Sequence, residues 1–202
     1  MNSNSHWQFI AIVLRNYPHN PDYQDTQNFR EFLEALQYVI PDTQYRHYYS
    51  LYLQKHSLDG ALDNNHTIIS WVGGMHPNLP LPTFEMNRSP AIIWEYISMI
   101  CHSYPLLPSF QETMFYKQFF QSLGKVLPQV RFRNQYMLAC RDIPIDPYLS
   151  SRENLIIWLG KIHGETPSVK PAQIIEGFDI DQTQLSIAVL ILIAIVIYSR
   201  IR

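Results

Sequence analysis

The side chains able to do chemistry are sparse along this chain of 202 residues. Two cysteines, Cys101 and Cys140, exclude a disulfide-dense scaffold and leave too few thiols for a Cys-rich zinc site. The eight histidines are scattered, without the regular spacing that metal ligands have. The Gly73-Gly74 pair stands alone and makes no phosphate-binding loop. The sequence therefore predicts no metal site, and a catalytic triad cannot be assembled from it.

Tryptophan and histidine residues nevertheless recur at one constant offset. A shift of 87 residues places segment 7–80 (the first copy) on segment 94–167 (the second copy) with 21 identities in 74 positions and no gap. Unrelated chains of ordinary composition would match at roughly 6% of positions, or about four or five pairs. We interpret the match as a tandem duplication. The recurring rings are Trp7, Trp71 and His76 in the first copy and Trp94, Trp158 and His163 in the second.

Helices must position these rings. Trp7, Ile10, Leu14 and Tyr17 follow a helical spacing, and Pro18 ends that run. Further helices of the first copy are expected from Asp22 or Asp25, near Tyr45–Gln54, and from near Asn64.

The second copy repeats this pattern of four helices. Its last helix has a predicted capped start at Ser150, because Glu153 follows three residues later. Apolar residues make up 47% of the chain and aromatic residues 13%, which is enough for an ordered core. The formal net charge of −2 leaves no basic footprint for nucleic acid. The predicted fold is all-α, with two tandem four-helix bundles.

The order and spacing of these residues resemble the flavin-linked sulfhydryl oxidases of the Erv/ALR type. That family has an early Trp, a Tyr-Pro or similar pair, a Pro-Cys-x-x-Cys stretch, and a late Trp before His-Asn-x-x-Asn. The place of the cysteine stretch is taken by Ile40–Tyr49 in the first copy and by Leu127–Tyr136 in the second. The place of the late Trp and the His-Asn segment is taken by Trp71–Pro80 and by Trp158–Pro167. The resemblance implies helical bundles that commonly dimerise, so we expect the two copies to form an intramolecular pseudo-dimer.

The departures from the family pattern bear directly on function. An oxidase of this type needs a dithiol beside the flavin, because one thiolate engages the ring and the other exchanges with substrate. Asp42 and Tyr45 occupy the two cysteine positions in the first copy, and Gln129 and Phe132 in the second. The resemblance thus predicts no catalytic residue and no FAD. If FAD were retained, its binding residues would be Trp7, Trp71, His76, Trp94, Trp158 and His163; otherwise these rings pack the core.

The C-terminal region has a different composition. No residue from Gln182 to Ser199 is charged, and 18 residues of helix span roughly 27 Å, close to the thickness of a thin bilayer. A buried helix or strand is the alternative reading. Acidic residues precede the segment, and Arg200 and Arg202 follow it. We predict a single-pass transmembrane anchor at residues 185–199.

Two properties of the sequence predict opposite orientations for this anchor. The arginines favour a C-terminus on the cytosolic side. A hydrophobic segment at the C-terminus without an N-terminal signal inserts after translation, which leaves the body in the cytosol. We expect a cytosol-facing body on a host internal membrane or a virion membrane, the latter because the resemblance points to large DNA viruses.

The predicted organisation has four parts: a first bundle at 1–88, a second at 89–175, a linker at 176–184 and the anchor at 185–199. The predicted function is that of a catalytically inactive, sulfhydryl-oxidase-like membrane protein with a structural or interaction role and protein partners. Two alternatives stay open. One is a FAD-dependent thiol oxidase that recruits Cys101 or Cys140, and the other is a generic tail-anchored helical adaptor.

Overall fold

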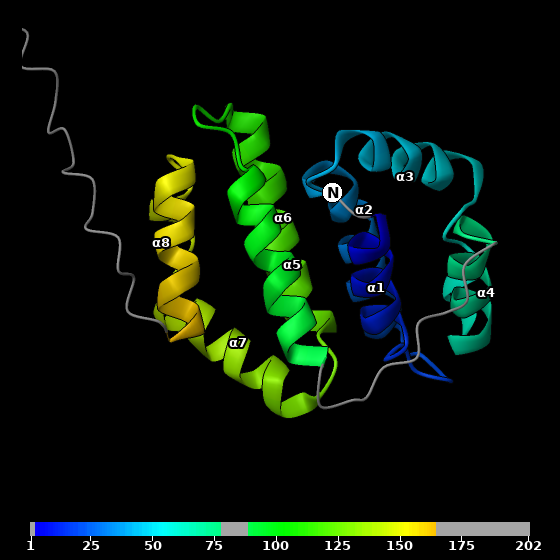
Figure 1. Cartoon of the computed structure of the whole chain (residues 1–202). Helices are drawn as coiled ribbons and strands as arrows, with labels where there is room; N and C mark the ends of the chain where they lie inside the picture. Colours follow the sequence, from blue (N-terminus) through cyan, green and yellow to red (C-terminus); the bar gives the residue numbers. More distant parts are fainter. Residues whose placement is uncertain (1–2, 78–88, 165–202) are drawn as a thin grey trace, which may run out of the picture. The chain divides into compact units, whose positions relative to one another are not determined.

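The computed structural model describes residues 3–77 and 89–164, and within these ranges it is helical, with no strand (Figure 1). The all-α prediction is thereby confirmed. The described helices belong to one compact unit, residues 1–167. They are α1 (Ser3–Leu14), α2 (Tyr23–Val39), α3 (Thr43–Lys55), α4 (Asn65–Met75), α5 (Ser89–Ser103), α6 (Phe110–Val126), α7 (Val130–Asp142) and α8 (Arg152–His163), with short 3₁₀ turns at Ala61–Asp63 and Asp146–Tyr148.

Helix lengths and starts follow the offset of 87 residues. Helices α2 and α6 both have 17 residues, and α3 and α7 both have 13. Asp22 caps α2 and Ser109 caps α6, and each does so in a capping box with the acidic residue three positions later. Of the two predicted starts of the second helix, Asp22 and Asp25, the structure confirms Asp22.

The fourth helix of each copy is also capped by a short polar side chain. The Asn64 side chain accepts hydrogen bonds from the first backbone N–H groups of α4, as its predicted start requires. For α8 the predicted cap, Ser150, is wrong. The cap is Ser151, which has extended backbone and accepts from the N–H of Asn154, while Ser150 bonds only to the Asn154 side chain.

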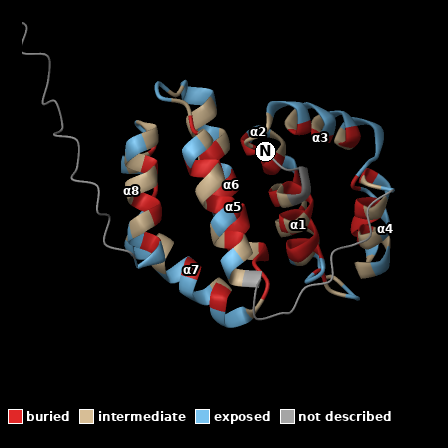
Figure 2. Ribbon diagram, in the orientation of Figure 1, coloured by how far each residue is buried: buried red, intermediate tan, exposed pale blue. Residues whose placement is uncertain are grey.

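Apolar side chains of all eight helices form the core, and buried positions recur along α1, α4, α5 and α8 in Figure 2. Helix α2 packs along α6, and α1 packs against α5. Two of these contacts join residues related by the offset itself. The Phe9 and Tyr96 rings stack with centroids 4.1 Å apart, and the Phe32 and Phe119 rings lie 6.0 Å apart.

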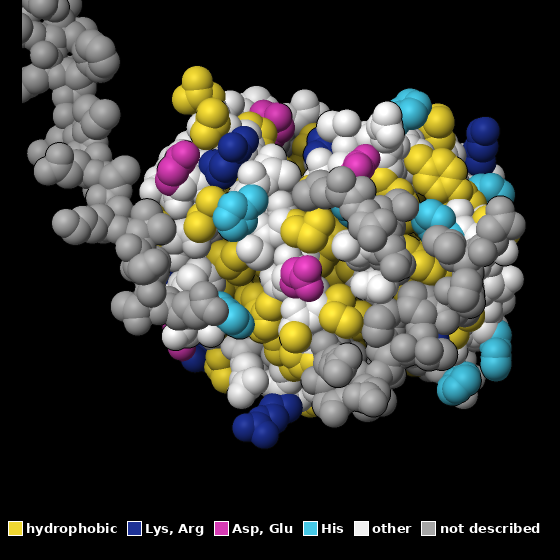
Figure 3. All heavy atoms as spheres, in the orientation of Figure 1, with side chains coloured by type: hydrophobic (Ala, Val, Ile, Leu, Met, Phe, Trp, Pro, Cys, Tyr) yellow, Lys and Arg dark blue, Asp and Glu magenta, His cyan; other side chains and the backbone are white. Residues whose placement is uncertain are grey.

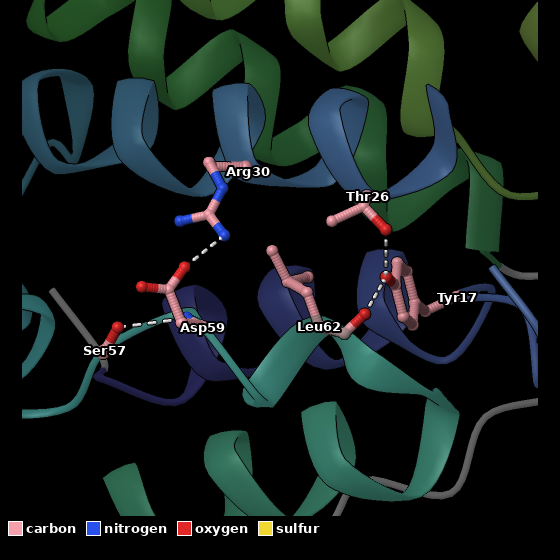
Figure 4. Close-up of polar contacts among 6 residues, drawn as sticks. All are labelled: Tyr17, Thr26, Arg30, Ser57, Asp59 and Leu62. Carbon is pink, nitrogen blue, oxygen red and sulfur yellow. Dashed lines mark hydrogen bonds and ion pairs between the residues drawn. The ribbon is translucent and has the colours of Figure 1, made fainter. Parts of the chain in front are cut away.

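Long-range hydrogen bonds that hold the loops also come in offset-related pairs. The Tyr17 hydroxyl donates to the Leu62 carbonyl (Figure 4), and the Tyr104 hydroxyl donates to the Leu149 carbonyl. On the surface nearby, Arg30 pairs with Asp59 at 2.7 Å in the first copy. The same positions in the second copy hold the ion pair of Lys117 with Asp146.

The predicted linker and anchor lie outside the described residues. Among the helices that the structure describes, none is both long and apolar enough to cross a bilayer.

Candidate functional site

In the first copy, the second cysteine position of the family motif is filled by a phenol that bonds to an imidazole. Tyr45 lies in the first turn of α3, and His76 follows the end of α4. The Tyr45 hydroxyl and His76 Nε2 are 2.8 Å apart, and their rings are stacked with centroids separated by 5.5 Å and planes 7° apart. Trp7 of α1 meets the His76 ring edge-on at 4.7 Å. The structure thus brings together two predicted site residues and a residue at a lost cysteine position.

A fourth ring, His6, joins this cluster and was not anticipated from the sequence. It stacks on Tyr45 with centroids 4.8 Å apart and has no solvent exposure. Its Nδ1 lies 2.9 Å from the hydroxyl of Tyr96 in the second copy, while Nε2 has no hydrogen-bond partner in the described part of the chain. His6 and Tyr96 are 90 residues apart, so no local spacing connects them. The neighbouring Trp7 was the only sequence signal close to it.

Burial keeps these rings neutral near pH 7. It raises the pKa of the Tyr45 phenol and lowers the pKa of the His76 imidazole. It also lowers the pKa of His6, although the nearby Asp42 carboxylate opposes this. The pKa of Asp42 itself is lowered, mainly because its side chain accepts a hydrogen bond from the backbone N–H of Tyr45. Asp42 therefore acts as the N-cap of α3, a structural role.

The stacked rings leave no space for a further aromatic ring between them. Inserting a planar ring between two others requires a separation of about 7 Å, two van der Waals contacts. The centroid separations are 4.8 Å between His6 and Tyr45 and 5.5 Å between Tyr45 and His76. A flavin ring does not fit between these side chains as they stand. The cluster also holds no cysteine, so it has no group that could exchange with a substrate thiol.

The second copy keeps the Trp–His contact and has an apolar ring at the position of Tyr45. The rings of Trp94 and His163 have centroids 4.5 Å apart, and those of Trp7 and His76 in the first copy are 4.7 Å apart. Phe132 stands where Tyr45 does and meets Trp94 edge-on at 5.9 Å. Gln129 is the N-cap residue of α7, but its side chain makes no capping hydrogen bond to the helix. Its φ of 65° lies in the left-handed region, which is unfavourable for residues other than glycine.

The other two predicted tryptophans have a different task. The indole of Trp71 donates to the carbonyl of His56, and that of Trp158 to the carbonyl of Ile143. Both bonds fix the chain just after the third helix of each copy. The predicted set therefore divides into ring-to-ring pairs (Trp7 with His76, Trp94 with His163) and indoles that hold a loop (Trp71 and Trp158).

The two thiols are free and poorly suited to redox chemistry. Cys101 is fully buried in α5, and burial raises the pKa of its thiol. Burial also raises the pKa of Cys140, to about 11. Because the thiolate is the nucleophile, the raised pKa values disfavour reaction of both thiols near neutral pH. No group of three or more metal-ligating side chains occurs among the described residues.

Comparison with known proteins gives one partial match. Over 71 residues the chain is 35% identical to a probable FAD-linked sulfhydryl oxidase of Acanthamoeba polyphaga mimivirus. The aligned part is 35% of this chain and 50% of the relative, so the chain spans about half of the relative's length. No family model matches, and no solved structure does either. The similarity agrees with the sulfhydryl-oxidase resemblance of the sequence, and its length is close to that of one copy.

Proposed function

We propose that this chain is a catalytically inactive, sulfhydryl-oxidase-like protein that serves as a membrane-anchored structural or interaction module. One observation carries the proposal: the place where such an oxidase needs its dithiol holds a neutral Tyr–His pair in one copy and Phe132 in the other. Neither arrangement can take part in disulfide exchange. The closed ring stack of the first copy further supports a protein that binds no FAD.

The two copies are proposed to pair as an isologous pseudo-dimer. In such an interface, contacts join equivalent residues at the axis and occur reciprocally away from it. Phe9 with Tyr96 and Phe32 with Phe119 are equivalent pairs that are in contact. These contacts support a fold in which an ancestral dimer interface became internal, which leaves the outer surface of both copies for protein partners.

Membrane anchoring is proposed from residues 185–199, with the body facing the cytosol. The run of 18 uncharged residues from 182 to 199 supports the anchor. The two arginines at 200 and 202 favour a cytosolic C-terminus and so argue against this orientation, which rests on insertion of the segment after translation. The viral relative adds a reason to consider a virion membrane as well as a host internal membrane.

Thiol-oxidase activity of the full chain tests this proposal. Oxygen uptake with dithiothreitol, in the presence of added FAD, is expected to equal that of buffer with FAD alone. Uptake that rises in proportion to protein concentration would overturn the proposal. The matched control is a Cys101→Ala/Cys140→Ala variant, because any activity of the chain has to use one of these thiols.

The second candidate function is a FAD-dependent thiol oxidase with a non-standard cysteine arrangement. The similarity to the mimivirus relative, a probable FAD-linked sulfhydryl oxidase, favours it. The raised pKa values of both thiols argue against it. Protein-dependent oxygen uptake that disappears in the double-alanine variant would establish this candidate in place of the first.

A further inference from the structure

Helix α7 presents an unusual face to solvent. Val130 is 62% exposed, and Met137 and Leu138 are each 49% exposed, although large apolar side chains are commonly buried. Positions 130, 134, 137, 138 and 141 lie on one side of a helix. We define the α7 face as the exposed residues Val130, Arg131, Asn134, Met137, Leu138 and Arg141.

Cationic groups flank the apolar side chains of the α7 face. The helix carries Arg131, Arg133 and Arg141 against the single acidic residue Asp142, which pairs with Arg141. At the lower edge of the view, where α7 runs in Figure 1, Lys or Arg and hydrophobic side chains are seen together in Figure 3. Apolar side chains with arginines beside them are typical of helices that lie on the surface of an acidic bilayer.

The equivalent helix of the first copy lacks these features. At the six positions of the α7 face, α3 carries Thr43, Gln44, His47, Ser50, Leu51 and Gln54. Leu138 and Leu51 are offset-related and identical, but the two exposed arginines, the valine and the methionine all have polar, uncharged counterparts. Because both helices have the same length and the same place in their copy, the fold itself does not require an apolar, cationic face.

The described chain ends next to α7. The Trp94 ring contacts Phe132 and Tyr136 of α7 and also His163, the last residue of α8. Residues 164–181 separate this point from the uncharged run at 182–199. At about 3.3 Å per residue, 18 residues can span at most about 60 Å. A membrane that holds the anchor is therefore within reach of α7.

We propose that the α7 face lies on the surface of the membrane that holds the C-terminal anchor, with its arginines against acidic lipid headgroups. Val130, Met137 and Leu138 then enter the boundary between headgroups and acyl chains, and Arg131 and Arg141 bind phosphate or carboxylate groups. The inference rests on the proposed anchor. It adds a second membrane contact that orients the body, so that the first copy faces away from the lipid.

An environment-sensitive fluorophore on the full-length chain tests this contact. Leu138→Cys and its offset-related control Leu51→Cys are each made in a Cys140→Ala background and labelled with nitrobenzoxadiazole; Cys101 is buried and does not react. The chains are reconstituted into vesicles of phosphatidylcholine with or without phosphatidylserine. We expect a blue-shifted, brighter emission for the label at 138 in phosphatidylserine vesicles, and emission typical of water for the label at 51.

Charge variants complete the test. Arg131→Gln/Arg141→Gln is expected to abolish the blue shift at 138 while the chain still co-floats with vesicles through its anchor. Arg15→Gln, at an exposed arginine of the first copy, is the control and leaves the shift unchanged. Co-flotation with a solvent-exposed label at 138 would overturn the α7 contact alone and leave this face to a protein partner. A chain that does not co-float would overturn the anchor and the α7 contact together.

Discussion

The two copies keep the same framework and differ at the place where a sulfhydryl oxidase would carry its thiols. In the first copy, a buried network joins His6, Tyr45 and His76 to Trp7. In the second, Phe132 replaces the phenol, and the Trp94 ring contacts both Phe132 and His163. Tyr45 in the first copy and Phe132 in the second fill the position where the resemblance places a cysteine, so the two copies pack this site with different side chains.

The framework itself is shared down to individual hydrogen bonds. The phenols of Tyr49 and Tyr136 donate to the carbonyls of Leu33 and Phe120, which are related by the same offset. These bonds join the third helix of each copy to the second. Interactions of this kind depend on helix packing and do not involve the cysteine positions of the family motif. The helices can therefore pack in the same way without thiols at those positions.

The sharpest test of the difference between the copies is the removal of their early tryptophans. Trp7 is 1% exposed and Trp94 is half-buried. We expect Trp7→Ala to lower the free energy of unfolding by about 3–5 kcal/mol, the usual cost of removing a buried aromatic ring. Trp94→Ala is expected to have a clearly smaller effect. Urea denaturation measures both variants, and equal losses would show that the two sites are packed alike.

The next largest effect is expected at the Tyr45 hydroxyl. Tyr45→Phe removes the donor or acceptor that pairs with His76 and leaves a half-buried imidazole without it, at a cost of about 1–3 kcal/mol. Tyr148→Phe is the control, because its hydroxyl bonds to the exposed Lys161 at the surface. A Tyr45→Phe variant as stable as the wild type would contradict a structural role for this pair.

A third prediction concerns acid stability. Burial lowers the pKa of His6 and His76 below 6.5, so the unfolded chain takes up protons at a higher pH than the folded chain does. Their contribution is complete above pH 6.5 and declines as the pH falls below that value. His6→Gln is expected to flatten this decline in denaturation curves measured from pH 7 to pH 5. His66→Gln, at an exposed site, should leave the decline as it is.

The smallest effect is expected at the two equivalent ion pairs. Arg30 with Asp59 and Lys117 with Asp146 both lie at the surface, where such pairs contribute less than about 1 kcal/mol. Asp59→Asn and Asp146→Asn should each lower stability by similar, small amounts that decrease further in high salt. A large loss at only one of them would mean that the copies differ here as well.

The sequence predicted the helices more fully than the site. Polar caps such as Asp22 and Asn64 mark helix starts because their side chains bind the free N–H groups locally. Two adjacent serines offered the same chemistry at α8, and backbone conformation rather than spacing selected Ser151. The contact between His6 and Tyr96 joins α1 to α5 across 90 residues, and tertiary packing alone creates it. The division of the predicted rings into contacting pairs and loop-holding indoles required the structure.

The most direct test of the central claim is the visible absorption spectrum of the full-length chain after incubation with FAD and removal of free flavin. We predict no absorption band at roughly 450 nm, the region where bound flavins absorb. The reason is that the chain's own rings fill the stack of His6, Tyr45 and His76 in the first copy, and no dithiol lies beside that stack. A stable flavin band, in an amount proportional to protein, would contradict the loss of the cofactor and with it the account of two copies kept for packing.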